Sequence, residues 1–335
     1  MRLSLLFMTI VVSWILTGLL RQYALKKNLL DVPNSRSSHT IPIPRGGGLA
    51  IVLTLFISLI FLSITHTLKS SVLVSLLGAG SLVAVIGFMD DHGHIPPKWR
   101  LLVHFMGALW GVVWLGNFPP LTIIGHPIHL VWLGYVAVAV LLVWLLNLFN
   151  FMDGIDGIAA SETIFVACSG LLFASLVGHT ALELVAIIII GSTVGFLIWN
   201  WPPAKIFMGD VGSGFLGIIL GIYAYWAMVE GAVSFWSWVI IFGVFLVDAT
   251  FTLLMRIYNR EIWYEAHRSH AYQHAANRWG HLRVTLIVSL INVMWLLPIA
   301  YISNSHREWG LVLTLLAFLP IVVLVSMLGA GRETG

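Results

Sequence analysis

The sequence is short of charge. Only 9% of its 335 residues are Asp, Glu, Lys or Arg, whereas 59% are hydrophobic and the mean hydropathy is +0.96. A soluble domain carries about 25% charged residues, because water has to solvate its surface. A water-soluble globule of this size is therefore excluded, and most of the surface has to face lipid.

Cysteine is almost absent too. The single Cys168 excludes a disulfide framework and any metal site built on a Cys-x-x-Cys pair. The chain also lacks the GxxxxGK[ST] phosphate-binding loop and the HExxH motif of zinc enzymes. Any site for phosphate or metal must therefore be built from other residues.

Long apolar runs are what the sequence does contain. A helix needs about 20 mostly apolar residues to cross a bilayer, and it satisfies its own backbone there. We therefore predict an all-α, polytopic integral membrane protein with about 11 transmembrane helices. The candidate spans are 3–20, 47–65, 71–88, 101–116, 130–147, 158–177, 181–199, 214–229, 234–257, 283–303 and 309–328.

The positions of the basic residues predict the orientation. With an uncleaved first span and its N-terminus outside, fourteen of the 17 Lys and Arg residues fall on the inner side. Cytoplasmic segments are enriched in these residues, so the N-terminus is predicted to be periplasmic and the C-terminus cytoplasmic. The net charge of +3 reflects this topology, and no nucleic acid is needed to explain it.

The polar motifs gather in the predicted cytosolic segments, which are 21–46, 89–100, 148–157, 200–213 and 258–282. Neither a soluble domain nor an internal repeat is visible. We predict that residues 1–335 form a single membrane-embedded domain, with an active site made by these five segments.

Carboxylates and amides recur in two of these segments. Asp90 and Asp91 close the third span, where they oppose the helix dipole and repel each other. This favours oxygen ligands or a proton acceptor that face a cation over solvated helix ends. Farther along, four polar residues are spaced by three, and helix capping by the last of them would not explain the other three. They are Asn147, Asn150, Asp153 and Asp156.

Two further segments leave alternatives open. Gly209-Asp210 before a predicted helix is either an ordinary cap or a phosphate-binding turn. His267, His270 and His274 are spaced to hold a transition metal, but basic groups that bind phosphate fit the acidic surroundings better. Two acids inside predicted spans, Asp248 and Glu162, are functional candidates as well.

Several acids, basic residues and glycine-rich turns at one membrane surface indicate a divalent cation and a phosphorylated ligand. Mg²⁺ prefers carboxylate and phosphate oxygens and would neutralise a diphosphate. Many spans are needed if one substrate is itself a lipid and the other is a cytosolic nucleotide.

Five stretches together resemble the polyprenyl-phosphate N-acetylhexosamine-1-phosphate transferase family, glycosyltransferase family 4. They occur in the family's order and extend over essentially the whole chain. The stretches are Pro44–Gly48, Met89–Asp91, Asn147–Gly157, Pro203–Ser213 and His267–His270.

The resemblance implies transfer of an N-acetyl-aminosugar-1-phosphate from a UDP-sugar to undecaprenyl phosphate in the bacterial inner membrane. UMP is released, and Mg²⁺, or Mn²⁺ in its place, is the implied cofactor. A direct attack of the lipid phosphate is favoured over a phosphorylated aspartate. A membrane transporter with a cytosolic-facing polar site is the alternative from another class. The oligomeric state is left open, with a homodimer among the options.

The resemblance also implies roles for single residues. Asp90 and Asp91 are the catalytic pair near the acceptor phosphate, with Asp90 as the base, and Asp210 with Asn150 holds the metal. The remaining matches are substrate-binding residues, among which Asp156 and Phe207 contact uracil. This group comprises Arg45, Arg100, Asn147, Asp153, Asp156, Asn200, Phe207, His267, Arg268 and His270.

One departure from the family narrows the substrate. The peptidoglycan branch carries three consecutive histidines, where this chain has His267-Arg268-Ser269-His270. The resemblance is therefore closer to the branch that initiates O-antigen. The choice between N-acetylated fucosamine, quinovosamine and glucosamine stays open.

Overall fold

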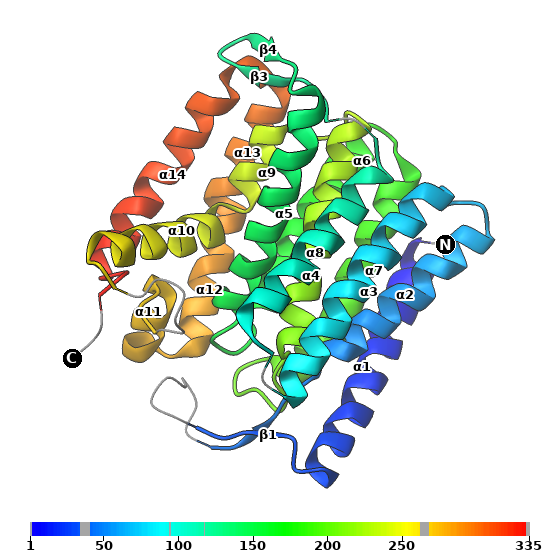
Figure 1. Cartoon of the computed structure of the whole chain (residues 1–335), viewed down its shortest axis with the longest axis vertical. Helices are drawn as coiled ribbons and strands as arrows, with labels where there is room; N and C mark the ends of the chain where they lie inside the picture. The colour runs from blue at the N-terminus through cyan, green and yellow to red at the C-terminus, as the bar shows by residue number, and fades with distance from the viewer. Residues whose placement is uncertain (1, 34–40, 94, 117, 262–267, 333–335) are drawn as a thin grey trace.

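The computed structural model describes residues 2–33, 41–93, 95–116, 118–261 and 268–332, and within them it is a bundle of helices with two small hairpins (Figure 1). The hairpins pair β1 (Leu30–Asp31) with β2 (Ile43–Pro44) and β3 (Leu121–Ile123) with β4 (His126–Ile128). The helices are α1 (Arg2–Lys26), α2 (Gly48–Ile64), α3 (Ser70–His92), α4 (Pro97–Val113), α5 (Val131–Met152), α6 (Ile158–Leu176), α7 (Thr180–Asn200), α8 (Asp210–Val229), α9 (Phe235–Ile241), α10 (Gly243–Tyr258), α11 (Ala271–Trp279), α12 (His281–Ile291), a π-helical turn (Asn292–Leu296), α13 (Leu297–Ser305), a 3₁₀ turn (Arg307–Trp309) and α14 (Gly310–Met327).

The predicted fold class is confirmed. Among the described residues, eight helices are long and apolar enough to cross a membrane, or nine if α9 and α10 are one span. All eleven predicted spans coincide with helices, but α2 and α4 have only 17 residues each. The chain is therefore an all-α polytopic membrane protein, while the span number of eleven and its orientation stay predictions.

Helix α8 lies at the centre of the bundle and is buried along nearly its whole length. It packs between α3 and α5, and its glycines permit close approach. A Cβ at Gly217 would lie 2.6 Å from the Cα of Leu146, and one at Gly221 would lie 2.4 Å from Leu142 Cδ2. The small residues on this helix therefore let its neighbours' backbones come close.

The predicted span 234–257 is wrong as a continuous helix. It breaks at Phe242, where α9 and α10 meet at 76°, and α10 runs across the bundle (Figure 1). Asp248 on α10 therefore does not lie deep along a straight span. Its carboxylate instead accepts hydrogen bonds from the backbone N–H groups of Ala271 and Tyr272, at 3.0 and 2.9 Å. These are the first residues of α11, so Asp248 caps that helix.

The other intramembrane acid ties two helices together. Glu162 on α6 accepts a hydrogen bond of 2.5 Å from the side-chain amide of Asn292. Asn292 begins the π-helical turn that follows α12, and both side chains are buried. Because a buried acid is costly without a partner, this contact fixes α12 against α6.

Helices α2 and α8 begin side by side. Backbone N–H groups of Gly47 and Gly48 donate to the carbonyls of Phe207 and Met208, each at 2.9 Å. The approach is so close that a Cβ at Gly48 would lie 2.3 Å from the Cα of Gly212. The segment before α2 and the turn before α8 are therefore held as one unit.

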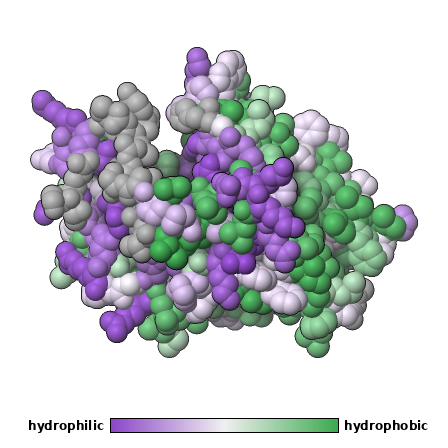
Figure 2. Space-filling model, turned by 90° about the horizontal axis from the view of Figure 1, so that it is seen from below, coloured by the Kyte–Doolittle hydropathy of each residue, from purple (hydrophilic) through white to green (hydrophobic). Residues whose placement is uncertain are grey.

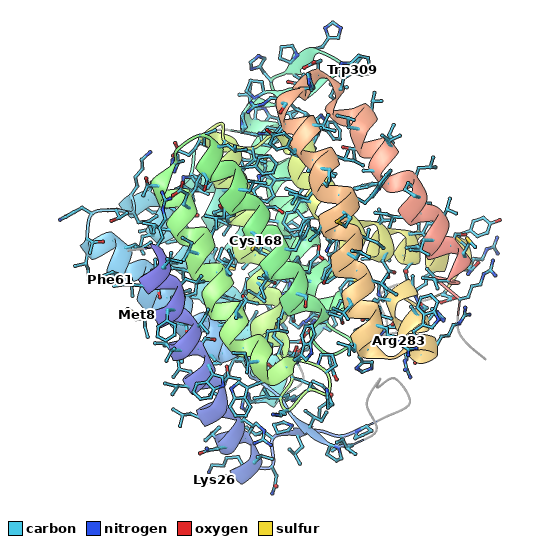
Figure 3. The ribbon with its side chains drawn as sticks, turned by 180° about the vertical axis from the view of Figure 1, so that it is seen from behind. Met8, Lys26, Phe61, Cys168, Arg283 and Trp309 are labelled. Carbon is cyan, nitrogen blue, oxygen red and sulfur yellow. The ribbon has the colours of Figure 1, made fainter. Side chains whose placement is uncertain are left out.

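Polar side chains gather at the end of the bundle where β1 lies. Figure 2 views this end, and hydrophilic residues are concentrated there beside largely hydrophobic flanks. Lys26 at the end of α1 and Arg283 on α12 lie at this end, whereas Trp309 lies at the opposite one (Figure 3). Cys168 lies between the two ends on α6 and is exposed (Figure 3).

We predict that Gly48→Ala displaces the turn before α8, because the new methyl group would collide with the backbone of Gly212. The variant should lose stability in thermal unfolding in detergent, by about 1–3 kcal/mol. Gly93→Ala is the matched control, since its Cβ would meet nothing closer than 3.9 Å. Equal unfolding temperatures for the two variants would contradict the predicted collision.

Candidate functional site

A cavity of about 280 Å³ lies at the polar end of the bundle. All five of the predicted segments contribute to its wall, so motifs far apart in the sequence meet in one place. The residues that line it are Asp31, Arg45, Asp91, Asn150, Asp153, Gly154, Ile155, Asp156, Asn200, Phe207, Met208, Gly209, Asp210, Ser213, Gln273 and His281. We call this cavity the acidic pocket, because five of these side chains are carboxylates.

Asp91 holds the start of α8 within the acidic pocket. It is the second-last residue of α3, and its two carboxylate oxygens accept hydrogen bonds from the backbone N–H groups of Asp210 and Val211, at 3.0 and 3.1 Å. The N-terminus of a helix has unsatisfied N–H groups and a partial positive charge. The residue that satisfies them therefore comes from another helix, and the interpretation of Asp210 as an ordinary cap is wrong.

Arg100 joins two acids on different helices. Its guanidinium forms an ion pair with Asp90, and the same nitrogen lies 3.3 Å from Asp210 Oδ2. Asn150 on α5 donates from Nδ2 to the other oxygen of Asp210, at 2.9 Å. The second oxygen of Asp90 accepts from the N–H of Ile95. Asp210 and Asn150 therefore lie side by side in the acidic pocket, whereas neither Asp90 nor Arg100 lines it.

Two acids lie in the turn between α5 and α6. Burial raises the pKa of Asp153 well above its usual range, and the nearby carboxylates of Asp210, Asp91 and Asp156 raise it further. One oxygen of Asp156 accepts from the N–H of Ala204 at 3.0 Å. The interpretation of Asp156 as a cap for α6 is wrong, because α6 follows Gly157, at φ 75°, without a side-chain cap.

Three other predicted residues connect the walls of the acidic pocket. Asn200, at the end of α7, accepts from the N–H of Gly157 and donates to the carbonyl of Ile206, both at 2.9 Å. Arg45 donates to the backbone carbonyl of Asp91. Phe207 lines the same pocket, and its N–H donates to the carbonyl of Pro44. Asn200 thus bonds to the backbone on both sides through its amide oxygen and its amide nitrogen.

The remaining predicted residues lie away from the acidic pocket or outside the described residues. Helix α5 extends to Met152, beyond the predicted end at 147, and Asn147 donates back to the carbonyl of Val143. Arg268 is bonded to Asn277, and His270 lies 3.4 Å from Asp248. His267 lies outside the described residues, so the structure does not place the three-histidine set.

Sequence reasoning missed four polar residues of the acidic pocket: Asp31, Ser213, Gln273 and His281. His281 begins α12, and its Nδ1 lies 3.2 Å from Asp156 Oδ2. Gln273 accepts through Oε1 from the N–H of His270, at 3.2 Å, as part of the α11 cap. Asp31 lies on β1 and the other three lie in or at the start of helices, and no repeated spacing marked any of the four.

The acidic pocket suits a hard cation. Its carboxylates and amide oxygens are the donors that Mg²⁺ prefers, and their mutual repulsion favours a positive partner. Among the described residues, no three His, Cys, Asp or Glu side chains form a ready metal cage. This fits Mg²⁺, which usually takes one or two carboxylates and completes its shell with water and substrate phosphate.

Known proteins resemble this chain along most of its length. Residues 73–228 match glycosyl transferase family 4. A probable undecaprenyl-phosphate N-acetylglucosaminyl 1-phosphate transferase of Bacillus subtilis is 29% identical over 325 residues, with 93% of this chain and 88% of the relative covered. The undecaprenyl-phosphate alpha-N-acetylglucosaminyl 1-phosphate transferase of Thermotoga maritima is 28% identical, with 84% and 85% covered. A phospho-N-acetylmuramoyl-pentapeptide-transferase of Streptococcus pneumoniae is 28% identical, with 64% and 67% covered.

We predict that Arg100→Met lowers the free energy of unfolding by about 1–3 kcal/mol, because it leaves Asp90 and Asp210 without the cation between them. Adding Asp90→Asn should recover part of this loss, since it removes one of the two charges. Denaturation in detergent would measure both variants. If the double variant is less stable than Arg100→Met alone, charge neutralisation by Arg100 is not what stabilises this cluster.

Proposed function

We propose that the chain is a member of glycosyl transferase family 4, whose model its residues 73–228 match, and that it transfers an N-acetyl-aminosugar-1-phosphate from a UDP-sugar to undecaprenyl phosphate, releasing UMP. The observation that carries this proposal is the acidic pocket, which lies at the polar end of a bundle of membrane-spanning helices. There a lipid headgroup and a water-soluble nucleotide can meet. Two of the relatives described above are undecaprenyl-phosphate N-acetylglucosaminyl 1-phosphate transferases by name.

We assign binding of the nucleotide part of the UDP-sugar to Asp156 and Phe207. Both line the acidic pocket. A phenyl ring offers a stacking surface for uracil, and a carboxylate oxygen accepts the hydrogen bond of its N–H group. Asp156 is held in place by the N–H of Ala204 and by His281, and Thr285 donates to its carbonyl. Its direction in the pocket is thereby fixed before the ligand arrives.

We assign binding of the diphosphate of the UDP-sugar to the region around Asp210. Asp210 and Asn150 would hold Mg²⁺, which would neutralise the diphosphate charge and favour departure of UMP. Arg45 also lines this pocket and supplies a permanent positive charge. These residues orient the β-phosphorus for attack.

The reaction we propose is a direct displacement. An oxygen of the lipid phosphate attacks the β-phosphorus of the donor, the bond to UMP breaks, and UMP carries away the electron pair. The base role expected for Asp90 is not favoured by its position, because both of its oxygens are bonded and it does not line the acidic pocket. A phosphate monoester with a second pKa near 6 is largely ionised at neutral pH, so the acceptor itself supplies the nucleophile.

The finer assignments rest on sequence. The segment that ends in Arg268-Ser269-His270 differs from a triple-histidine run and supports a product that initiates O-antigen or a related surface glycan. The basic residues support a pocket on the cytosolic side of the inner membrane. A transporter is disfavoured, because transport sites lie near the bilayer midplane, whereas this pocket lies at one end of the bundle.

The direct test is release of UMP by purified protein with undecaprenyl phosphate, Mg²⁺ and a panel of UDP-N-acetyl sugars. Release should require the lipid and stop when EDTA is added. Asp210→Asn should lower kcat at least about 100-fold, as expected for loss of a metal ligand. Glu261→Gln is the control, because this acid pairs with Arg256 and does not line the acidic pocket. No UMP release with any sugar of the panel, under conditions in which the protein is folded, would refute the transferase proposal.

A second experiment tests the uracil assignment. Phe207→Leu should raise KM for the UDP-sugar about tenfold, since stacking of a base on an aromatic ring is worth about 1–3 kcal/mol. Phe207→Tyr keeps the ring and should stay near the parent value. KM for undecaprenyl phosphate should not change in either variant. An equal effect of the two substitutions would argue against stacking.

A further inference from the structure

A second, much smaller cavity lies behind the Arg100–Asp210 ion pair. Its volume is about 10 Å³, which is room for about one water molecule. Four helices meet around it, namely α3, α4, α5 and α8. The residues that line it are Val83, Ile86, Gly87, Arg100, His104, Leu146, Asn150, Asp210 and Gly214.

His104 is the unexplained residue of this cavity. It lies one helical turn after Arg100 on α4, so both side chains share one face of the helix. The side chain is only 6% exposed, and its Nδ1 has no hydrogen-bond partner among the residues that the structure describes. A buried nitrogen without a partner is destabilising, so a ligand in the cavity is expected.

The other polar groups of the cavity specify that ligand. Arg100, Asn150 and Asp210 line it together with His104, while the rest of the wall is apolar. Buried waters typically make about three hydrogen bonds, whereas cavities that stay empty are apolar throughout. We propose that one buried water fills this cavity and joins His104 Nδ1 to the Arg100–Asp210–Asn150 cluster.

This water makes His104 a positioning residue. The guanidinium of Arg100 lies between Asp90 and Asp210, and the water holds it from the smaller cavity, which Arg100 and Asp210 both line. The catalytic consequence rests on the proposed function, in which Asp210 has to hold a fixed place beside the diphosphate. Small displacements of such groups cost large factors in rate.

Two substitutions at one position separate hydrogen bonding from packing. His104→Leu fills similar space but offers no polar atom, and kcat should fall about tenfold, with KM for both substrates within about twofold. His104→Gln keeps a polar group that can reach the water and should retain most of the activity. Thermal unfolding in detergent checks that both variants are folded.

Gly214→Ala removes the water without touching any polar residue. A Cβ at Gly214 would lie 3.3 Å from Val83 Cγ1 and 3.7 Å from Leu146 Cδ2, two residues of the cavity wall. It should therefore reproduce the kcat loss of His104→Leu. Gly107→Ala is the matched control, because its methyl group would be packed as tightly, at 3.4 Å from Val83 Cγ2, but outside the cavity.

A high-resolution structure provides a readout that does not depend on activity. Density for one water is expected in the parent and in His104→Gln, and none in His104→Leu or Gly214→Ala. An empty cavity in the parent, or equal kcat for His104→Leu and His104→Gln, would overturn the inference. If the parent shows the water but transfers no sugar phosphate, the proposed function fails while the water site stands.

Discussion

The site depends on the contact between the carboxylate of Asp91 and the first turn of α8. It brings the end of α3 to the start of the most buried helix, and Gly87 and Gly209 leave room for this close approach. A capping carboxylate stabilises a helix start both by hydrogen bonding and through the helix dipole. Asp210 is the first residue of α8, so its place follows from this contact, and the places of Arg100 and Asn150 follow from Asp210.

The cost of this arrangement is repulsion among buried acids. Burial raises the pKa of Asp153 well above its usual range, and the charges of Asp210, Asp91 and Asp156 raise it further. The acids that repel one another are thus concentrated at one end of the molecule, in the acidic pocket. The opposite end carries simple contacts, such as the ion pair between Lys69 and Glu230 at 3.1 Å.

The sequence could predict the fold class and much of the pocket lining, because both are encoded locally. Apolar runs reveal helices without reference to tertiary structure, and Asn150, Asp153 and Asp156 are spaced to recur on one side of the chain. Contacts across the bundle were not predictable. The role of Asp91 depends on a residue 119 positions later, and the break at Phe242 leaves hydropathy nearly unchanged. His281 was missed because a single histidine carries no pattern.

Because Asp91 and Asp210 are far apart along the chain, the two sides of their contact are synthesised at different times. During synthesis α3 enters the bilayer before α8. The carboxylate of Asp91 is therefore in the membrane before the N–H groups of Asp210 and Val211 that it binds have been synthesised. Until α8 is inserted, the acids of α3 and of the α5–α6 turn do not line a common pocket. A nascent chain that ends before Gly209 lacks the residues of α8 that complete the acidic pocket.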